Sequence, residues 1–374
     1  MKLVTAGESH GKTLTGIIEG LPSNLKIDIS AINGYLALRQ SGYGRGGRQK
    51  IESDKVEILS GVRNLLTLGS PLAFEVRNRD YDNWREFMAP EGCDVTKKTL
   101  TCVRPGHADL TGMIKYDQTD ARNILERASA RETAVRVAAG SIFRQYLSAL
   151  GVQISGYVKS VCGISDDRYH PFGDLENAKK QPLFMLDADK QLAAMELIDE
   201  LKDEGDTAGG IIEIRVKGLK SGFGSCMQYS AKLDAILCGA VMSVQAIKGV
   251  EVGLGFEAAN RRGSQVHDKI YYEDKFYRET NNAGGIEGGM SNGEEIVLRA
   301  AMKPIPTLMQ GLRTVDYNTK EACTAASERS DVAAICAAEI VIESVVATAL
   351  AEVVSERLGG DNMHEVVERY KLLK

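Results

Sequence analysis

A helical hydrophobic pattern in the middle of the chain constrains the fold most strongly. Between Ile124 and Leu150, apolar residues recur every three to four positions, a spacing that buries one face of an α-helix. The arginines in or next to this stretch cannot all lie on that face, so several must point at solvent, carboxylates or an anionic ligand. These arginines are Arg122, Arg127, Arg131, Arg136 and Arg144. The commoner arrangement for such a helix is a solvated charged face, with Glu126 and Glu132 as partners.

The composition is that of a folded globular protein. At 374 residues, with 43% hydrophobic and 26% charged residues, the chain can bury a full core. The net charge of −5 gives no overall attraction to nucleic acid or to an anionic membrane surface, so an anion site must be local. We therefore expect no nucleic-acid partner and no membrane association. Residues 1–5 also lack the apolar core of a signal peptide.

The cysteines indicate the compartment. Seven of them stand singly along the chain, without a Cys-x-x-Cys pair. An odd number of isolated cysteines predicts reduced thiols in a cytoplasmic protein. The sequence also shows no grouping with the spacing of metal ligands, so no metal site is predicted.

Two glycine-containing segments imitate nucleotide-binding motifs. Residues 6–13 nearly match a phosphate-binding loop, but residues 14–22 alternate and end at proline, which predicts a strand where that loop needs a helix. Residues 253–258 follow a predicted strand like a dinucleotide-binding turn, yet residues 260–263 break the helix that such a unit requires. We expect neither site.

Three residues are candidate acid–base groups. His10 and His107 each lie in a turn containing glycine. The glycines beside His10 permit close approach of a ligand, although His10 could be a structural histidine bonded to the backbone. Asp331 precedes a strongly apolar helical stretch that ends at Gly359. An N-cap role there is the commoner one, and it is compatible with catalysis.

Cationic and glycine-rich segments point to phosphorylated ligands. A predicted helix over residues 28–41 leads into a glycine- and arginine-rich segment, residues 42–48, which we interpret as a flexible lid over an anionic small molecule. The alternative from another class is an RNA-binding Arg-Gly-Gly segment. Residues 281–293 offer many backbone N–H groups, and residues 303–307 form a rigid basic turn. The residues alone predict one or two phosphorylated anions beside acid–base groups, without naming a reaction.

The remaining pattern predicts a mixed chain. Residues 79–88, which include the only tryptophan, are expected to form an exposed polar loop. Helices are expected over residues 187–203 and 233–247. Strands are expected over residues 56–59, 72–77, 152–164, 210–217, 250–252 and 295–301.

Three separated blocks resemble the chorismate synthase family. They are residues 7–11, residues 104–109 with 129–133, and residues 283–293 with 303–307 and 329–331. The resemblance extends from end to end and implies a single domain over residues 1–374. Its fold would be α+β, with long helices sandwiched between antiparallel β-sheets, assembled as a homotetramer.

The resemblance also implies a reaction. It is the last step of the shikimate pathway to aromatic amino acids, in which 5-enolpyruvylshikimate 3-phosphate is converted to chorismate and phosphate. The reaction would be a 1,4-anti elimination that uses reduced FMN without net oxidation or reduction. The anion sites would then serve one leaving phosphate, two carboxylates and one flavin phosphate.

Residue roles follow from the same resemblance. His107 would donate a proton towards the leaving phosphate, His10 would protonate or hydrogen-bond the reduced flavin, and Asp331 would assist removal of the ring proton, through flavin N5. Arginines would bind the phosphate and carboxylates of the substrate, or the phosphate of NADPH: Arg39, Arg45, Arg48, Arg104 and Arg131. The flavin contacts would be Arg127, Ala128, Ser129, Gln245, Ala246, Gly288, Lys303, Pro304, Ile305, Pro306, Thr307 and Arg329.

Two positions depart from the family pattern, and two functional alternatives stay open beside the favoured one. Many relatives have Asn where Gln245 stands and His where Ser330 stands, which affects the expected flavin contacts. We favour a monofunctional synthase that depends on an external flavin reductase, because no dinucleotide-binding fingerprint is present. The alternatives are a bifunctional enzyme that also reduces its flavin with NADPH, and an FMN-binding reductase without elimination.

Overall fold

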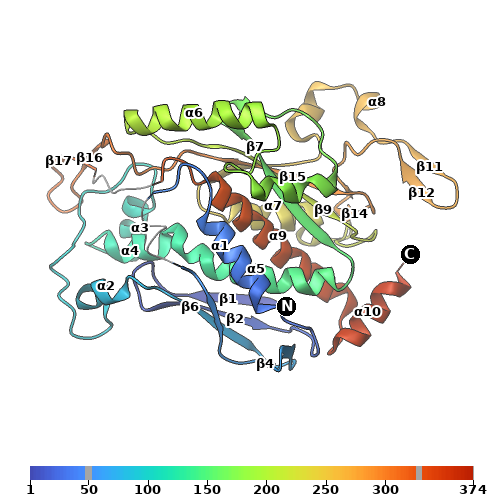
Figure 1. Ribbon diagram of the computed structural model, residues 1–374, viewed down its shortest axis with the longest axis horizontal. Helices are drawn as coiled ribbons and strands as arrows, with labels where there is room; N and C mark the ends of the chain where they lie inside the picture. Colours follow the sequence, from blue (N-terminus) through green and yellow to red (C-terminus); the bar gives the residue numbers. More distant parts are fainter. Residues whose placement is uncertain (47–52, 326–330, 374) are drawn as a thin grey trace.

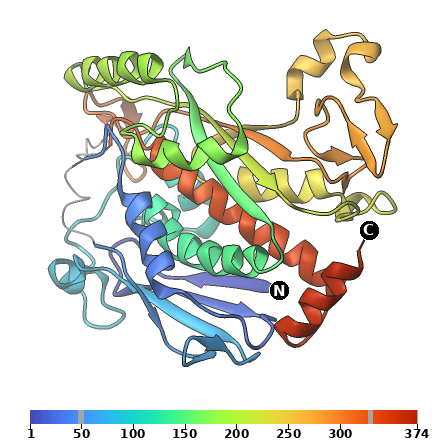
Figure 2. The same cartoon turned by 45° about the vertical axis from the view of Figure 1, so that its right-hand side comes forward.

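Two antiparallel sheets enclose a layer of long helices (Figures 1 and 2). The computed structural model describes residues 1–46, 53–325 and 331–373. The first sheet has the strand order β1 (Lys2–Ala6), β2 (Thr13–Glu19), β6 (Leu72–Arg77) and β3 (Val56–Ile58). The second has the order β10 (Ile247–Val252), β15 (Ile296–Met302), β9 (Gly210–Lys217), β7 (Gln153–Val161) and β8 (Ile164–Ser165). The helices between them are α1 (Ile29–Gln40), α5 (Thr133–Ser148) and α9 (Ile335–Leu358). The predicted α+β class with sandwiched helices is confirmed.

Shorter elements surround this core. The peripheral helices are α2 (Tyr81–Met88), α3 (Asp109–Tyr116), α4 (Arg122–Ala128), α6 (Ala188–Glu204), α7 (Leu233–Met242), α8 (Gly263–Val266) and α10 (Met363–Leu372). Single turns of 3₁₀ helix or short runs of them are η2 (Ala130–Glu132), η3 (Phe172–Lys180), η4 (Tyr229–Ala231) and η5 (Gly255–Asn260). Paired short strands are β4 (Val62–Arg63) with β5 (Leu66–Thr67), β11 (Ile270–Tyr272) with β12 (Phe276–Arg278), β13 (Ile286–Glu287) with β14 (Met290–Ser291), and β16 (Arg313–Val315) with β17 (Ala322–Thr324). In Figure 1 the β11–β12 hairpin projects from the body of the molecule.

The central helix α9 is buried on nearly all sides because it lies between α5 and the second sheet. A helix in this position must be apolar around its whole circumference, which the run of Ala, Val and Ile provides. Gly140 allows α5 to approach α9 closely, since a Cβ at that position would lie 2.4 Å from the Cβ of Ser344. This close packing fixes the end of α9 from which the functional site is built.

Two glutamates of α9 are nevertheless fully buried. Glu343 Oε2 lies 2.8 Å from Arg144 Nη1, and its Oε1 lies 2.8 Å from Lys179 Nζ. Glu339 stands one turn earlier, with Oε1 3.9 Å from the same Lys179 Nζ. Burial and the nearby charge of Glu343 raise the pKa of Glu339 well above its ordinary value. Although burial alone would raise it, the charges of Lys179 and Arg144 hold the pKa of Glu343 below the ordinary value.

Most of the predicted elements are confirmed. The Asp28 side chain caps α1 by accepting the Ala31 backbone N–H, and Asp187 caps α6, which ends at Gly205. The segment after residue 13 is strand β2 and not a helix, as predicted for a chain without a phosphate-binding loop. Likewise, β10 is followed by a short 3₁₀ helix where a dinucleotide-binding unit would continue as a long α-helix.

Four sequence predictions about the secondary structure and the thiols are wrong. Residues 79–88 contain helix α2 where we expected a loop. The long helix ending at Leu150 is interrupted at Ser129, and the helix expected over residues 233–247 ends at Met242 because Ile247 already begins β10. The fourth concerns the thiols, since Cys102 and Cys323 are joined as a disulfide. In residues 1–46, 53–325 and 331–373, no helix is both long and apolar enough to cross a lipid bilayer.

Candidate active site

One cavity gathers most of the predicted site residues. Its volume is about 470 Å³, within the usual range for small-molecule and cofactor sites. Turns and chain segments next to both sheets, together with α1, α4 and the start of α9, form its wall. The predicted residues on this wall are His10, Arg39, Arg45, Arg104, His107, Ala128, Ser129, Arg131, Gln245, Ala246, Lys303, Ile305, Pro306, Thr307 and Asp331.

Some predicted residues lie off this wall. The Arg127 guanidinium donates to the backbone oxygens of Thr5 and Gly7, and Gly288 lies in the turn between β13 and β14. Pro304 also does not line the cavity. Arg48, Arg329 and Ser330 fall outside the described residues, as does residue 47 of the predicted lid, whereas residues 42–46 of that lid are described. Their proposed ligand contacts stay predictions.

The break between α4 and α5 turns one arginine towards the cavity. Ser129 adopts an extended conformation, with φ −59° and ψ 141°, and its hydroxyl accepts the Arg131 backbone N–H. The chain then resumes as η2 and α5, whose residues enter the core. Arg39 stabilises this junction by donating to the backbone oxygen of Ala130 at 2.9 Å and to the hydroxyl of Thr133 at 2.9 Å.

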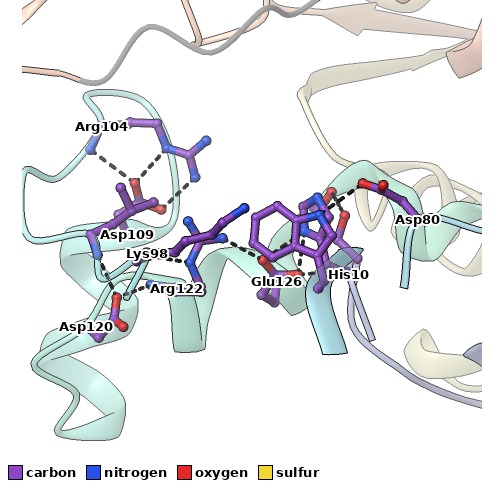
Figure 3. A network of polar contacts seen from close by, with 12 residues as sticks. His10, Asp80, Lys98, Arg104, Asp109, Asp120, Arg122 and Glu126 are labelled. Atoms are coloured by element: carbon purple, nitrogen blue, oxygen red, sulfur yellow. Dashed lines mark hydrogen bonds and ion pairs between the residues drawn. The ribbon is translucent and has the colours of Figure 1, made fainter. Parts of the chain in front are cut away.

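His10 is held by a buried carboxylate on α4 (Figure 3). Its Nδ1 lies 2.9 Å from Glu126 Oε1, and its backbone N–H donates to Glu126 Oε2 at 2.8 Å. Arg122 Nη1 donates to the same carboxylate at 3.0 Å. Although burial would raise it, the hydrogen bond and charge of His10 together with Arg122 hold the pKa of Glu126 below its ordinary value. Glu126 is therefore an ionised partner of the ring and not part of a solvated helix face.

His107 has a similar partner on a separate segment. Its Nδ1 lies 2.5 Å from Asp109 Oδ1, and Asp109 also accepts from Arg104 Nε at 2.8 Å. Burial would raise the pKa of Asp109, but the hydrogen bonds from His107 and Arg104 hold it well below its ordinary value. Gly106, at φ +74°, makes the turn, and its carbonyl accepts from Lys303 Nζ at 2.9 Å. The basic turn of residues 303–307 thus contacts the His107 loop.

The arginines predicted to bind substrate are already paired in part. Asp54, whose side chain is fully buried, accepts two bonds of 2.7 Å from Arg131 Nη1 and one of 3.4 Å from Arg39 Nη1. Burial lowers the pKa of the Arg39 guanidinium to about 10, which leaves it charged at neutral pH. Asp54 therefore fixes the orientation of both guanidinium groups at the cavity wall.

Asp331 is not the N-cap of α9. That position is taken by Ala334, three residues after Asp331. Asp331 Oδ1 accepts the backbone N–H of Gly46 at 2.6 Å, and Oδ2 lies 3.1 Å from Arg45 Nη1. The expected cap is wrong because residues 332–333 donate their backbone N–H groups to Gly44 before the helix begins.

Gln245 offers an acceptor at the cavity wall. Its Nε2 donates to Glu132 Oε1 at 2.7 Å, while its Oε1 is buried and has no hydrogen-bond partner in the described structure. A buried carbonyl oxygen without a partner is costly, so a ligand N–H or O–H would satisfy it.

The structure offers no metal site in the residues that it describes. Residues 1–46, 53–325 and 331–373 hold no group of three or more His, Cys, Asp or Glu side chains that could bind a metal ion together.

Sequence reasoning missed several functional side chains. No role was predicted for Asp54 or for Trp84, whose ring stacks on His10 with centroids 3.9 Å apart. Asp109 was predicted only as the last residue of the block 104–109. Asp109 stands two residues after His107, so this short spacing could have suggested the pair. No sequence signal connects Trp84 with His10 or Asp54 with Arg131, because these contacts are made across the fold.

Comparison with known proteins gives a consistent result. The profile of the chorismate synthase family matches residues 1–354. The chorismate synthase of Alkaliphilus metalliredigens is 52% identical over 373 residues, covering 99% of this chain and 98% of the relative. That of Geobacter sulfurreducens is 53% identical over 385 residues, with 99% and 98% covered. A chorismate synthase crystal structure superposes with a TM-score of 0.79 at 39% identity, covering 99% of this chain and 96% of the other. The chain therefore belongs to the chorismate synthase family of lyases.

Proposed function

We propose that the chain converts 5-enolpyruvylshikimate 3-phosphate to chorismate and phosphate by a 1,4-anti elimination, with reduced FMN bound in the same cavity. The observation that carries this proposal is that two histidines, four arginines and one aspartate from distant parts of the chain line one cavity. The proposal includes a homotetramer and an external flavin reductase, which rest on the family resemblance.

The charges suit a substrate with three anionic groups, one phosphate and two carboxylates. Arg39, Arg45, Arg104 and Arg131 surround the cavity, and a guanidinium group binds a phosphate or carboxylate through two parallel hydrogen bonds. Their carboxylate partners hold them in place before substrate arrives, which lowers the entropic cost of binding. A substrate anion would add to or replace some of these contacts.

The residues present also fit a flavin. The buried Gln245 Oε1 lacks a hydrogen-bond partner in the described structure and could accept from a ring N–H. Ala246, Lys303, Pro306 and Thr307 would complete the contact surface. When bound, reduced FMN would supply electron density that eases loss of the phosphate, which is chemistry that no side chain provides.

Three side chains would handle the protons. His107, with Nδ1 committed to Asp109, would donate a proton from Nε2 towards the leaving phosphate. Asp331, paired with Arg45, would provide the carboxylate that assists loss of the ring proton. His10 would hydrogen-bond the cofactor. Loss of one ring proton and one phosphate balances the elimination, with no net electron transfer.

An anaerobic assay tests the proposal. Purified protein would be mixed with 5-enolpyruvylshikimate 3-phosphate and dithionite-reduced FMN, and phosphate release and chorismate absorbance would be followed. We expect turnover with dithionite and none with NADPH and oxidised FMN. Turnover with NADPH would instead establish a bifunctional enzyme. Flavin binding without turnover in either mixture would overturn the elimination and favour a reductase.

A further inference from the structure

The structure assigns a positioning role to Glu126 and Trp84: together they hold His10 with Nδ1 protonated, so that Nε2 is the ring nitrogen that exchanges a proton with a bound ligand. The inference rests on the proposed function, in which His10 meets the cofactor. It goes further because it names the groups that set the tautomer and orientation of this histidine.

Glu126 fixes the tautomer. Its side chain is 2% exposed and accepts from both the ring and the backbone N–H of His10 (Figure 3). An ionised carboxylate can only accept hydrogen bonds, so the proton between the two groups must reside on Nδ1. Because Nδ1 is committed in this way, any proton that His10 passes to a ligand must travel through Nε2. The carboxylate also stabilises the imidazolium form.

Trp84 fixes the plane of the ring. Its indole stacks on His10 with ring centroids 3.9 Å apart and an angle of 28° between the planes. The indole is itself oriented, because Nε1 donates to Asp80 Oδ2 at 2.9 Å. None of the eight residues of α2 is fully buried in the described structure, so core packing does not explain this placement. The contact with His10 is the clearest function of the helix.

Charged groups from two sides act on this ring. Glu126 and Arg122 approach from α4, and Lys98 Nζ lies 3.8 Å from the centroid of the Trp84 indole. Glu126 contacts the imidazole directly. Lys98 acts on it through the indole, and Arg122 acts on it both through Glu126 and through the indole, whose centroid lies 5.0 Å from Arg122 Cζ. Removal of the Glu126 charge should therefore disfavour the imidazolium more than any other single change.

Trp84 is the only tryptophan of the chain, so the fluorescence of the protein reports on the surroundings of one indole, which include His10. A protonated imidazole in contact with indole quenches its emission. In protein without flavin or substrate, we expect His10→Asn to raise the emission, because it removes the ring that contacts the indole. Glu126→Gln, which keeps an oxygen acceptor but loses the charge, should also raise the emission. An emission spectrum of Glu126→Gln that superposes on that of the parent would overturn the inference.

Turnover provides the second readout. Glu126→Gln should lower kcat by about 10- to 100-fold while KM changes by less than about threefold, as expected for a group that orients another. Trp84→Ala should lower kcat by about tenfold, and Trp84→Phe, which keeps an aromatic face, should restore most of it. The matched control is Glu213→Gln, a buried carboxylate paired with Arg215 and Arg299 in the second sheet.

The control separates positioning from stability. Glu213→Gln should lower thermal stability about as much as Glu126→Gln while leaving the emission spectrum and kcat near parent values. An equal loss of kcat in both variants would reject a specific role for Glu126. If the parent shows no turnover at all, the proposed function fails, yet the fluorescence comparison still decides whether Glu126 and Trp84 control His10.

Discussion

Two glutamates one turn apart on α9 should respond to the same substitution with opposite signs. Glu339 and Glu343 are both fully buried, but Arg144 and Lys179 contact Glu343 at 2.8 Å, whereas Lys179 stands 3.9 Å from Glu339. The raised pKa of Glu339 means that this carboxyl keeps its proton in the folded state at pH values where the unfolded chain has released it. Stability contributed by this group is therefore present below the ordinary pKa and is lost as pH rises.

The size of the effect follows from linkage. The ordinary pKa of Glu339 is 4.5, so holding the proton at pH 7 spans roughly 2.5 pH units at about 1.36 kcal/mol each, or about 3.4 kcal/mol at most. Glu339→Gln removes this cost and leaves an amide whose hydrogen bonds are imperfect, a penalty of about 1 kcal/mol. We therefore expect the free energy of unfolding at pH 7 to increase, by no more than about 2 kcal/mol.

Urea unfolding at pH 5 and pH 7 measures the difference in the free energy of unfolding between Glu339→Gln and the parent. The advantage of Glu339→Gln over the parent should grow by up to about 2.7 kcal/mol between the two pH values. The partner variant Glu343→Gln leaves Arg144 and Lys179 buried without their main counter-charge and should lose about 3–5 kcal/mol. If Glu339→Gln destabilises the protein as much as Glu343→Gln at both pH values, the assignment of the proton to Glu339 is refuted.

Two further predictions concern the cavity. Asp109→Asn removes the charge that orients His107 and pairs with Arg104. In steady-state anaerobic kinetics, kcat should therefore fall by about 10- to 100-fold. A change below about threefold would contradict the pairing. Asp331→Asn keeps an acceptor for the Gly46 N–H and loses the charge that faces Arg45. The free energy of unfolding should therefore change by less than about 1 kcal/mol while kcat falls at least about 100-fold. Parallel losses of stability and activity would indicate a purely structural carboxylate.

Local sequence patterns predicted the core elements well. Strands β2 and β6 could be predicted because apolar and polar residues alternate along them. Helices α1 and α6 could be predicted because each begins at a capping aspartate. The Arg-Pro-Gly-His turn and the other resembling blocks likewise located most of the cavity wall. Each of these features can be read from a few neighbouring residues.

The errors have a common physical origin in long-range contacts. Ser129 interrupts an otherwise helical pattern because Arg39, some 90 positions earlier, holds the backbone of Ala130. Helix α2 has a polar sequence with no core face, and Trp84 is placed by His10 instead. Asp331 does not cap α9 because the next two residues donate their backbone N–H groups to the carbonyl of Gly44, far earlier in the chain, before the helix begins. None of these partners can be identified from spacing alone.

The carboxylates of the site were the hardest part to foresee. Asp54 and Glu126 lie far in sequence from the arginine and histidine that they orient. Their sequence neighbourhoods look like ordinary charged surface, yet both are buried at the cavity. Resemblance to a family identified the groups expected to touch ligands, whereas the structure was needed to find the groups that hold them.

The most direct test of the account is the turnover of His107→Ala under anaerobic conditions with reduced FMN and 5-enolpyruvylshikimate 3-phosphate. If His107 gives a proton to the leaving phosphate in this cavity, kcat should fall by about 10²- to 10⁴-fold with a modest change in KM, the usual contribution of one general acid. Retention of near-parent kcat would contradict the account, because the elimination would then proceed without His107 as the proton donor.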